Sequence, residues 1–184
     1  MLVFIFTLFP ILATLLIGLF CAVSDFKKLQ IPNQYNLIII GLFFITHICL
    51  FFIKPDLYII PTFMSGIIAC AILFAISVLM FVFRLMGAGD SKMMSAFALF
   101  IGVQQIPVFL FYMMMTGAVL GILTLLFGKF KPVKNPAEGS WIYHAQQGDK
   151  TKVPYGIAIL SGIIFAFIYA GLFNFQTYLP LFAR

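Results

Sequence analysis

Six long runs of apolar residues, separated by polar segments, dominate the hydrophobic pattern of this chain. They cover about residues 1–23, 36–53, 57–83, 90–105, 106–127 and 154–173. The runs lack the alternation of a membrane β-barrel, so helices are the remaining way to span a bilayer, which takes ~20 apolar residues each. The pattern therefore predicts an all-α polytopic membrane protein, a single bundle of six transmembrane helices that occupies residues 1–184.

The fourth run is short for a span, and the positions of the basic residues decide whether it crosses. If it crosses, nine Lys and Arg residues lie on one side of the membrane: Lys27, Lys28, Arg84, Lys92, Lys129, Lys131, Lys134, Lys150 and Lys152. Only Lys54 and Arg184 then lie on the other side, whereas without a crossing the division is five against six. Because basic loops stay in the cytoplasm, we expect six spans in the cytoplasmic (inner) membrane, with the N-terminus outside and both large polar loops inside.

Composition and charge agree with a membrane protein. The chain is 64% hydrophobic and 9% charged, whereas a soluble domain averages about 25% charged residues. The net charge of +6 comes from residues between apolar runs, which indicates topology and contact with anionic lipids rather than nucleic acid.

The three cysteines lie in apolar runs without a C-x-x-C pair, so we expect no metal and no cofactor. No basic segment precedes the first run, which predicts a retained helix rather than a cleaved signal peptide.

Two of the five acidic residues stand at the ends of apolar runs. Asp25 follows the first run, and Asp90 opens the fourth within the segment Gly87-Ala88-Gly89-Asp90. Two spans separate the two acids, so both must lie on the same side of the membrane. An ionisable residue at the edge of a membrane segment indicates a functional site. The alternative for Asp90 is a solvated turn in which it caps the next helix.

The two glycines before Asp90 lack a Cβ, so backbone or substrate can approach closely there. We expect the close approach beside Asp90 to occur at Gly89. A valine at Gly89 should therefore disturb the acid or block the substrate more than a valine at Ala88, which already carries a Cβ.

Two carboxylates in a partly dry site share one proton. The charged carboxylate can activate a water molecule while the protonated one polarises a peptide carbonyl, which is the chemistry of an aspartic protease. One alternative is a small transporter or proton relay that uses the two acids, and another is a non-catalytic assembly scaffold. Transporter sites usually lie near the bilayer midplane, whereas Asp25 and Asp90 lie at helix ends, which favours the protease.

Three segments of the chain resemble one family, the type IV prepilin peptidases, which are membrane aspartic proteases of the G-x-G-D type. Residues 87–92 resemble the G-x-G-D segment with its following lysine, and residues 153–159, Val-Pro-Tyr-Gly-Ile-Ala-Ile, resemble the start of the family's last helix. Residues 24–33, with Asp25 and the run Ile31-Pro32-Asn33, resemble the loop that bears its first catalytic acid. The resemblance covers nearly the whole chain.

The resemblance implies that Asp25 and Asp90 are catalytic. It also implies that seven further residues shape the site or bind substrate: Gly87, Gly89, Lys92, Pro32, Asn33, Pro154 and Tyr155. The implied substrate is a prepilin or pseudopilin helix, cut at the cytoplasmic face behind a short basic leader, with a pilus assembly machine as a further partner. The paired cysteines of the family's zinc and methyltransferase domain are absent, so we expect a peptidase only. This short form is similar to the Flp/Tad-pilus enzymes, and an archaeal-type preflagellin peptidase is the alternative.

Overall fold

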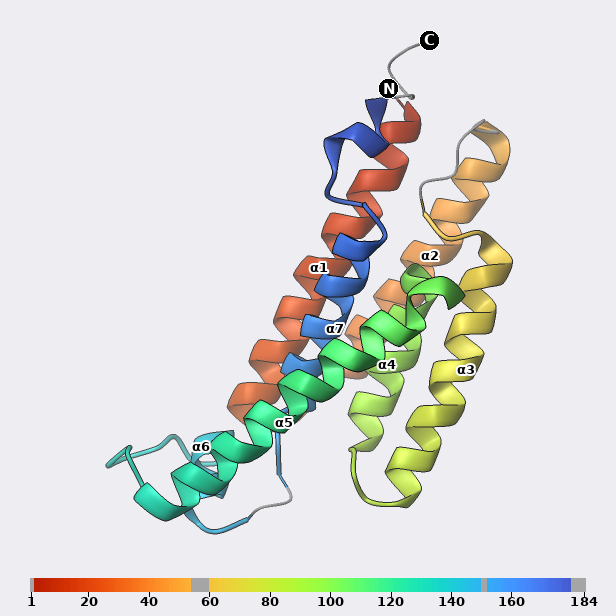
Figure 1. The fold of residues 1–184 in the computed structure, drawn as a ribbon. Helices are drawn as coiled ribbons and strands as arrows, with labels where there is room; N and C mark the ends of the chain where they lie inside the picture. Colours follow the sequence, from red (N-terminus) through yellow and green to blue (C-terminus); the bar gives the residue numbers. More distant parts are fainter. Residues whose placement is uncertain (1, 54–59, 150–151, 180–184) are drawn as a thin grey trace.

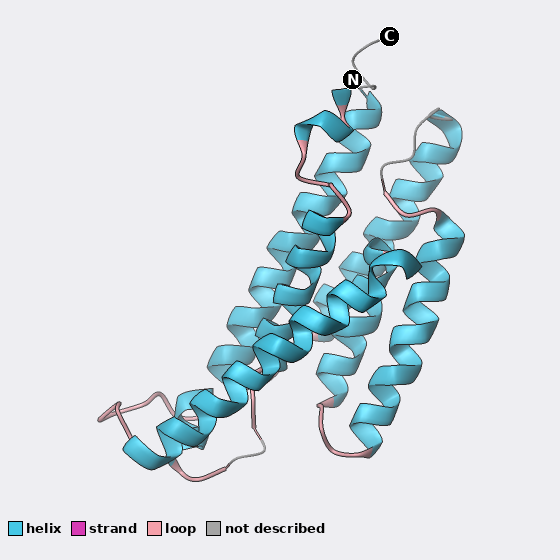
Figure 2. Cartoon of the chain, in the orientation of Figure 1, coloured by secondary structure: helices cyan, strands magenta, loops and turns pink. Residues whose placement is uncertain are grey.

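The structure is a computed structural model that describes residues 2–53, 60–149 and 152–179. In this part of the chain seven α-helices follow one another: α1 (Leu2–Lys28), α2 (Asn33–Ile53), α3 (Phe63–Val82), α4 (Ala88–Ile101), α5 (Ile106–Phe130), α6 (Trp141–Gln146) and α7 (Tyr155–Tyr169). Short 3-10 helices follow α4, at Val103–Gln105, and α7, at Phe175–Thr177. The described residues contain no strand (Figures 1 and 2), and the prediction of an all-α protein is confirmed.

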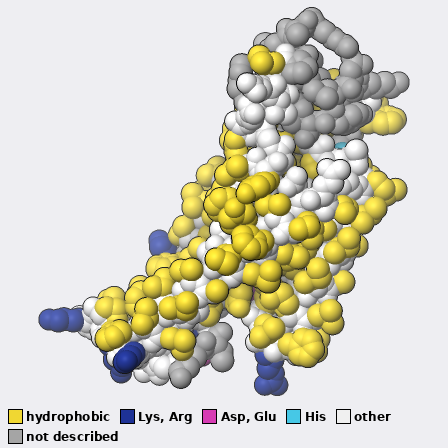
Figure 3. All heavy atoms as spheres, in the orientation of Figure 1, with side chains coloured by type: hydrophobic (Ala, Val, Ile, Leu, Met, Phe, Trp, Pro, Cys, Tyr) yellow, Lys and Arg dark blue, Asp and Glu magenta, His cyan; other side chains and the backbone are white. Residues whose placement is uncertain are grey.

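Four helical segments within the described ranges are long and apolar enough to cross a membrane. They are Ile5–Lys28, Asn33–Ile53, Phe63–Val82 and Val103–Phe130, while Tyr155–Tyr169 is a shorter apolar helix. Large apolar side chains cover the visible surface of the bundle (Figure 3), and some, such as Phe52 and Phe83, are at least 70% exposed. An apolar surface of this extent suits contact with lipid rather than water. The chain is therefore a multi-pass membrane protein, as predicted.

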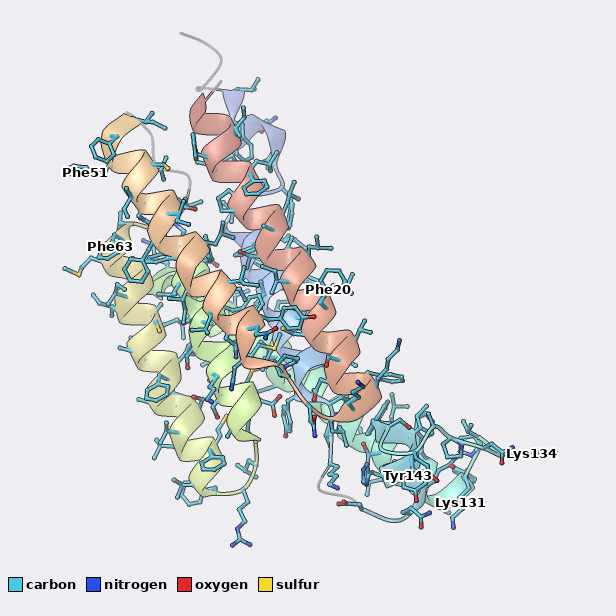
Figure 4. All side chains as sticks on the ribbon, turned by 180° about the vertical axis from the view of Figure 1, so that it is seen from behind. Phe20, Phe51, Phe63, Lys131, Lys134 and Tyr143 are labelled. Atoms are coloured by element: carbon cyan, nitrogen blue, oxygen red, sulfur yellow. The ribbon has the colours of Figure 1, made fainter. Side chains whose placement is uncertain are left out.

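Successive helices of the bundle alternate in direction, and α5 crosses the others obliquely (Figure 1). The α1–α2 and α3–α4 connections consequently lie at the same end of the molecule. The first turns of α1, the end of α2 and the start of α3 lie at the opposite end. Viewed from behind, Phe51 and Phe63 lie near one end, and Lys131, Lys134 and Tyr143 near the other (Figure 4). Among the described residues, the Lys and Arg side chains that can be seen in Figure 3 lie in its lower half, the end with the α1–α2 and α3–α4 connections.

Helix α4 forms the centre of the bundle. Every residue from Ser91 to Ile101 is buried except Lys92, and α4 packs against α2, α3, α5 and α7. A helix of 14 residues is about 21 Å long at 1.5 Å per residue, which is shorter than the hydrocarbon core. Because neighbouring helices surround it, this short helix makes its contacts with protein rather than lipid.

The first polar connection is shorter than the sequence pattern predicts. Helix α1 continues through Asp25 to Lys28, and α2 begins at Asn33, so the expected loop at 24–35 is wrong in its extent. Lys27 and Lys28 in the last turn stabilise the negative end of the helix dipole. Leu29 then ends the helix with a left-handed φ of 51°, and its N–H donates to the carbonyl of Asp25 at 2.8 Å. Asp25 is thus held on a helix rather than in a loop.

The long polar segment between α5 and α7 contains the short helix α6, which the apolar pattern did not predict. Ser140 caps it by accepting from the N–H of Tyr143. Trp141 is buried, donates its indole N–H to Thr124 Oγ1 at 2.9 Å and packs edge-on against Phe26. These contacts fix α6 against α5 and the end of α1. Residues 54–59, which include the start of the third apolar run, and residues 180–184 lie outside the described residues.

Helices α5 and α7 pack closely because Gly162 allows it. A Cβ at Gly162 would lie 2.7 Å from the carbonyl oxygen of Phe109 and 2.8 Å from its ring. We expect Gly162→Ala to lower the free energy of unfolding by about 1–3 kcal/mol, the usual cost of overpacking. Gly121→Ala is the matched control because nothing lies within 4 Å of its Cβ position. Thermal unfolding of the detergent-solubilised variants measures both, and equal melting temperatures would contradict this packing.

Candidate active site

Asp25 projects from the last turns of α1 into the bundle, where its side chain is only 5% exposed. Its Oδ2 accepts a hydrogen bond of 2.7 Å from the backbone N–H of Gly156, the second residue of α7. A carboxylate near the C-terminus of its own helix is electrostatically disfavoured, but the N-terminus of another helix stabilises it. The start of α7 therefore compensates for the position of Asp25 on α1.

Asp90 is the third residue of α4, and its carboxylate folds back to the start of that helix. Its Oδ2 accepts from the N–H of Gly87 at 3.1 Å, and Gly87 is the N-cap residue. Asp90 therefore caps α4, but it does so as the third residue of the helix rather than as the N-cap residue. The other oxygen, Oδ1, is buried and has no hydrogen-bond partner among the described residues. One carboxylate oxygen is thus fixed, and the second is left for another group.

The two acids meet at one end of the bundle, although 65 positions of the sequence separate their numbers. They lie close enough for their charges to interact. Both line a pocket of about 610 Å³ and also a smaller pocket of about 180 Å³. Leu29 and Gly87 likewise line both pockets. The pair of carboxylates therefore lies between two adjoining spaces, one of them large enough for several residues of a peptide.

Most of the other predicted site residues surround the same pair. Pro32, Asn33, Gly89 and Lys92 line the larger pocket together with Gly87, and Tyr155 lines the smaller one. Pro154 is buried at the N-cap of α7 and is not among the lining residues. The Lys92 ammonium donates to Asn33 Oδ1 at 3.2 Å. This bond ties the start of α2 to α4 across the larger pocket.

The two glycines of the α3–α4 connection differ in the space around them. A Cβ at Gly87 would lie 2.9 Å from Asp90 Oδ2, whereas a Cβ at Gly89 would meet Ile31 at 3.7 Å, an ordinary contact. The crowding of Asp90 expected at Gly89 is therefore wrong and occurs at Gly87. Gly89 remains part of the wall of the larger pocket.

Sequence reasoning missed Gly156 as a partner of Asp25. Besides donating its N–H, Gly156 lies so close that a Cβ there would be 3.0 Å from Asp25 Cβ and 3.1 Å from Asp25 Oδ2. Gly156 lies in the segment 153–159, but no feature of the local sequence pattern marks this glycine as a partner of Asp25. Lys152, which lines the smaller pocket, was also missed; it pairs with Asp149 at 3.5 Å. Within the described ranges, no group of three His, Cys, Asp or Glu side chains is placed to hold a metal ion.

Comparison with known proteins identifies the family. A family model described as the type IV leader peptidase family matches residues 11–122, which include both Asp25 and Asp90. No curated protein and no solved structure matches the chain significantly. Because the matched segment is more than half of the 184 residues, this membrane protein belongs to the type IV leader peptidase family and is a peptidase.

Proposed function

We propose that this protein is an aspartic endopeptidase in which Asp25 and Asp90 act as one catalytic pair. The observation that carries the proposal is the meeting of two carboxylates beside a pocket of about 610 Å³: that of Asp25 from α1, which is buried, and that of Asp90 from α4, which is partly buried. Each carboxylate keeps one oxygen on a backbone N–H, of Gly156 or of Gly87. Fixed carboxylates that share a proton are suited to general acid and base catalysis.

Hydrolysis then proceeds without a covalent enzyme intermediate. The ionised carboxylate takes a proton from water, and the oxygen of that water attacks the peptide carbonyl carbon. The protonated carboxylate donates a hydrogen bond to the carbonyl oxygen as negative charge develops on it. Collapse of the tetrahedral intermediate breaks the C–N bond, and a proton passes from the pair to the leaving amine. Both carboxylates return to their starting protonation, with one shared proton.

The proposed substrate is a prepilin-like protein with a short basic leader before an apolar helix. The scissile peptide would lie extended in the larger pocket, against the exposed backbone of the α1–α2 and α3–α4 connections, as an added strand would. The apolar helix would remain in the lipid beside the bundle. The basic residues at this end would contact anionic lipid headgroups, and a pilus assembly machine is the proposed further partner.

The location of the acids favours a hydrolase over a transporter. Asp25 lies in the last turns of α1 and Asp90 in the first turn of α4, so both are near one end of the bundle. Transport sites are expected near the middle of the membrane, between broken helices. A site that opens at one end can admit a peptide from that side alone.

Purified protein in detergent tests the proposed activity directly. A synthetic prepilin-like peptide and a preflagellin-like peptide are each incubated with the protein, and mass spectrometry identifies the products. We expect one cut, immediately before the apolar segment, in at least one of the peptides. Intact peptides after long incubation with folded protein would contradict the proposed function, and the peptide that is cut distinguishes the two substrate classes.

The orientation of the bundle is tested by cysteine labelling. We expect a cysteine at Asn135, in the α5–α6 connection, to react only with reagent that reaches the cytoplasm, because the basic loops stay there. A cysteine at Asp56, between α2 and α3 in the sequence, should react only from outside. The native cysteines are first replaced, and intact cells and lysed cells are then labelled with a membrane-impermeant maleimide. Labelling in intact cells identifies an outer position, and labelling only after lysis identifies a cytoplasmic one. The reverse pattern would move the proposed active site to the other face.

A further inference from the structure

The buried face of α2 contains a polar residue for which the fold provides no partner. Five residues of this helix are buried: Asn36, Ile39, Phe43, Thr46 and Leu50. Their spacing forms one helical stripe, and Asn36 is its first member, at the end of α2 nearest the catalytic pair. Asn36 is 5% exposed, and neither its Nδ2 nor its Oδ1 has a hydrogen-bond partner among the described residues. A buried amide without partners is costly, so its presence calls for a function.

The packing of α2 places Asn36 between the two helices that carry the acids. The buried stripe faces α4, where Phe43 contacts Phe100, and α2 also packs against α1. Near the active-site end, Tyr35 stacks on Phe20 of α1 with ring centroids 6.4 Å apart, and Asn33 accepts from Lys92 of α4. Because α1 runs antiparallel to α2, these pairs set Asn36 at the level of the residues just before Phe20 on α1 and just after Lys92 on α4. That level is between about one and two helical turns deeper than Asp25 and Asp90.

Two sets of unpaired polar atoms therefore lie on the neighbouring helices α2 and α4, in the half of the bundle that holds the site. Asp90 Oδ1 is an acceptor without a donor, and the Asn36 carboxamide offers both a donor and an acceptor. A water molecule between them would satisfy all three atoms, because water can accept from Asn36 Nδ2 and donate to Asn36 Oδ1 and Asp90 Oδ1. Asn36 is not among the residues that line the substrate pocket, so its partner is more simply water than peptide.

We propose that Asn36 is a third polar group of the active site, which holds the reacting water against Asp90. This inference rests on the proposed peptidase function. Asn36 gives up no proton; it orients the water so that a lone pair points to the substrate carbonyl while one O–H points to Asp90. Removal of such a positioned hydrogen-bonding group typically lowers turnover by about 100- to 1,000-fold.

The test compares two substitutions that each remove an unpartnered buried polar group. Asn36→Leu replaces the amide with an apolar side chain of similar shape. Thr14→Val does the same in α1, where Thr14 Oγ1 is also buried and unpartnered, about 16 Å along the helix from Asp25 at 1.5 Å per residue. We expect both variants to melt close to the wild-type temperature, because neither substitution breaks a hydrogen bond between protein groups. Only Asn36→Leu should lose kcat, by about 100-fold, with KM changed less than about twofold because Asn36 is outside the substrate pocket.

A second variant keeps the test decisive if Asn36→Leu folds poorly. Asn36→Ser retains one hydroxyl that can donate and accept, and it should keep a kcat between those of the wild type and Asn36→Leu. Wild-type kcat in Asn36→Leu, or equal losses in Asn36→Leu and Thr14→Val, would overturn the role of Asn36. So would full activity in Asn36→Ser together with a raised KM. If wild-type protein itself does not cleave, the proposed function fails; if it cleaves and Asn36→Leu cleaves equally well, only this inference fails.

Discussion

Asp25→Asn and Asp90→Asn are each expected to lower the rate of peptide cleavage by about 1,000-fold or more, the upper range for loss of a general acid or base. Asparagine has nearly the same shape as aspartate, so the amide oxygen can still accept from the N–H of Gly156 or of Gly87. The fold should therefore survive, but the substituted side chain can no longer take or give a proton. Cleavage is measured by mass spectrometry with equal amounts of folded, purified variants.

Glu138→Gln is the matched control for these two substitutions. Glu138 is an exposed acid in the connection between α5 and α6, and its change removes one negative charge without touching the site. We expect wild-type cleavage from this variant and unchanged melting temperatures for all three. Full activity in either the Asp25 or the Asp90 variant would show that the two acids do not act as a pair.

Gly156→Ala should lower turnover although it adds only one methyl group and leaves both acids in place. The added methyl group would lie 3.0 Å from Asp25 Cβ, 3.1 Å from Asp25 Oδ2 and 3.4 Å from the Cα of Ala22. Either α7 or the end of α1 must then shift by a few tenths of an ångström. The shift would lengthen the 2.7 Å bond from Gly156 to Asp25 and turn the carboxylate away from Asp90. Since misplacement by 1 Å costs on the order of 100-fold, we expect kcat to fall by about 10- to 100-fold.

The control for Gly156→Ala is Gly117→Ala, a glycine on α5 that faces the same helix. A Cβ at Gly117 would make only ordinary contacts, at 3.6 Å to Tyr155 and 3.9 Å to Ala158. We expect this variant to cleave normally. Comparable activity in the two variants would mean that the contact between Asp25 and the start of α7 does not govern the reaction.

The sequence by itself determined the class of protein and the side on which its acids lie. Apolar runs long enough to span a bilayer leave helices as the only solution, so the helical class and the order of the long helices follow from the pattern. Two such runs separate Asp25 from Asp90, and the parity of the crossings puts both acids at one end without knowledge of any contact. The same parity argument, with the basic residues, predicts the orientation in the membrane.

The helix boundaries near the site were harder to predict from the sequence, because they depend on local hydrogen bonds rather than on hydropathy. The polar residues from Ser24 to Lys28 look like a loop, yet they continue α1. Two features favour the helix: the basic last turn, and the bond from Gly156, which satisfies Asp25 in the interior. The donor lies 131 positions away in the sequence, so no local pattern could reveal it.

Only the tertiary structure decided which residues touch the acids. A hydropathy pattern gives the length of each helix but not its rotation about its own axis. Because these helices are apolar on all faces, no apolar stripe in the sequence identifies the side that is buried. Packing selects that side: it turns Asn36 inward and crowds Gly87 rather than Gly89 against Asp90. It also brings α7 against α1, so that a backbone N–H meets Asp25. The sequence could therefore place both acids at one end of the bundle, whereas the approach of α1, α4 and α7 made them neighbours.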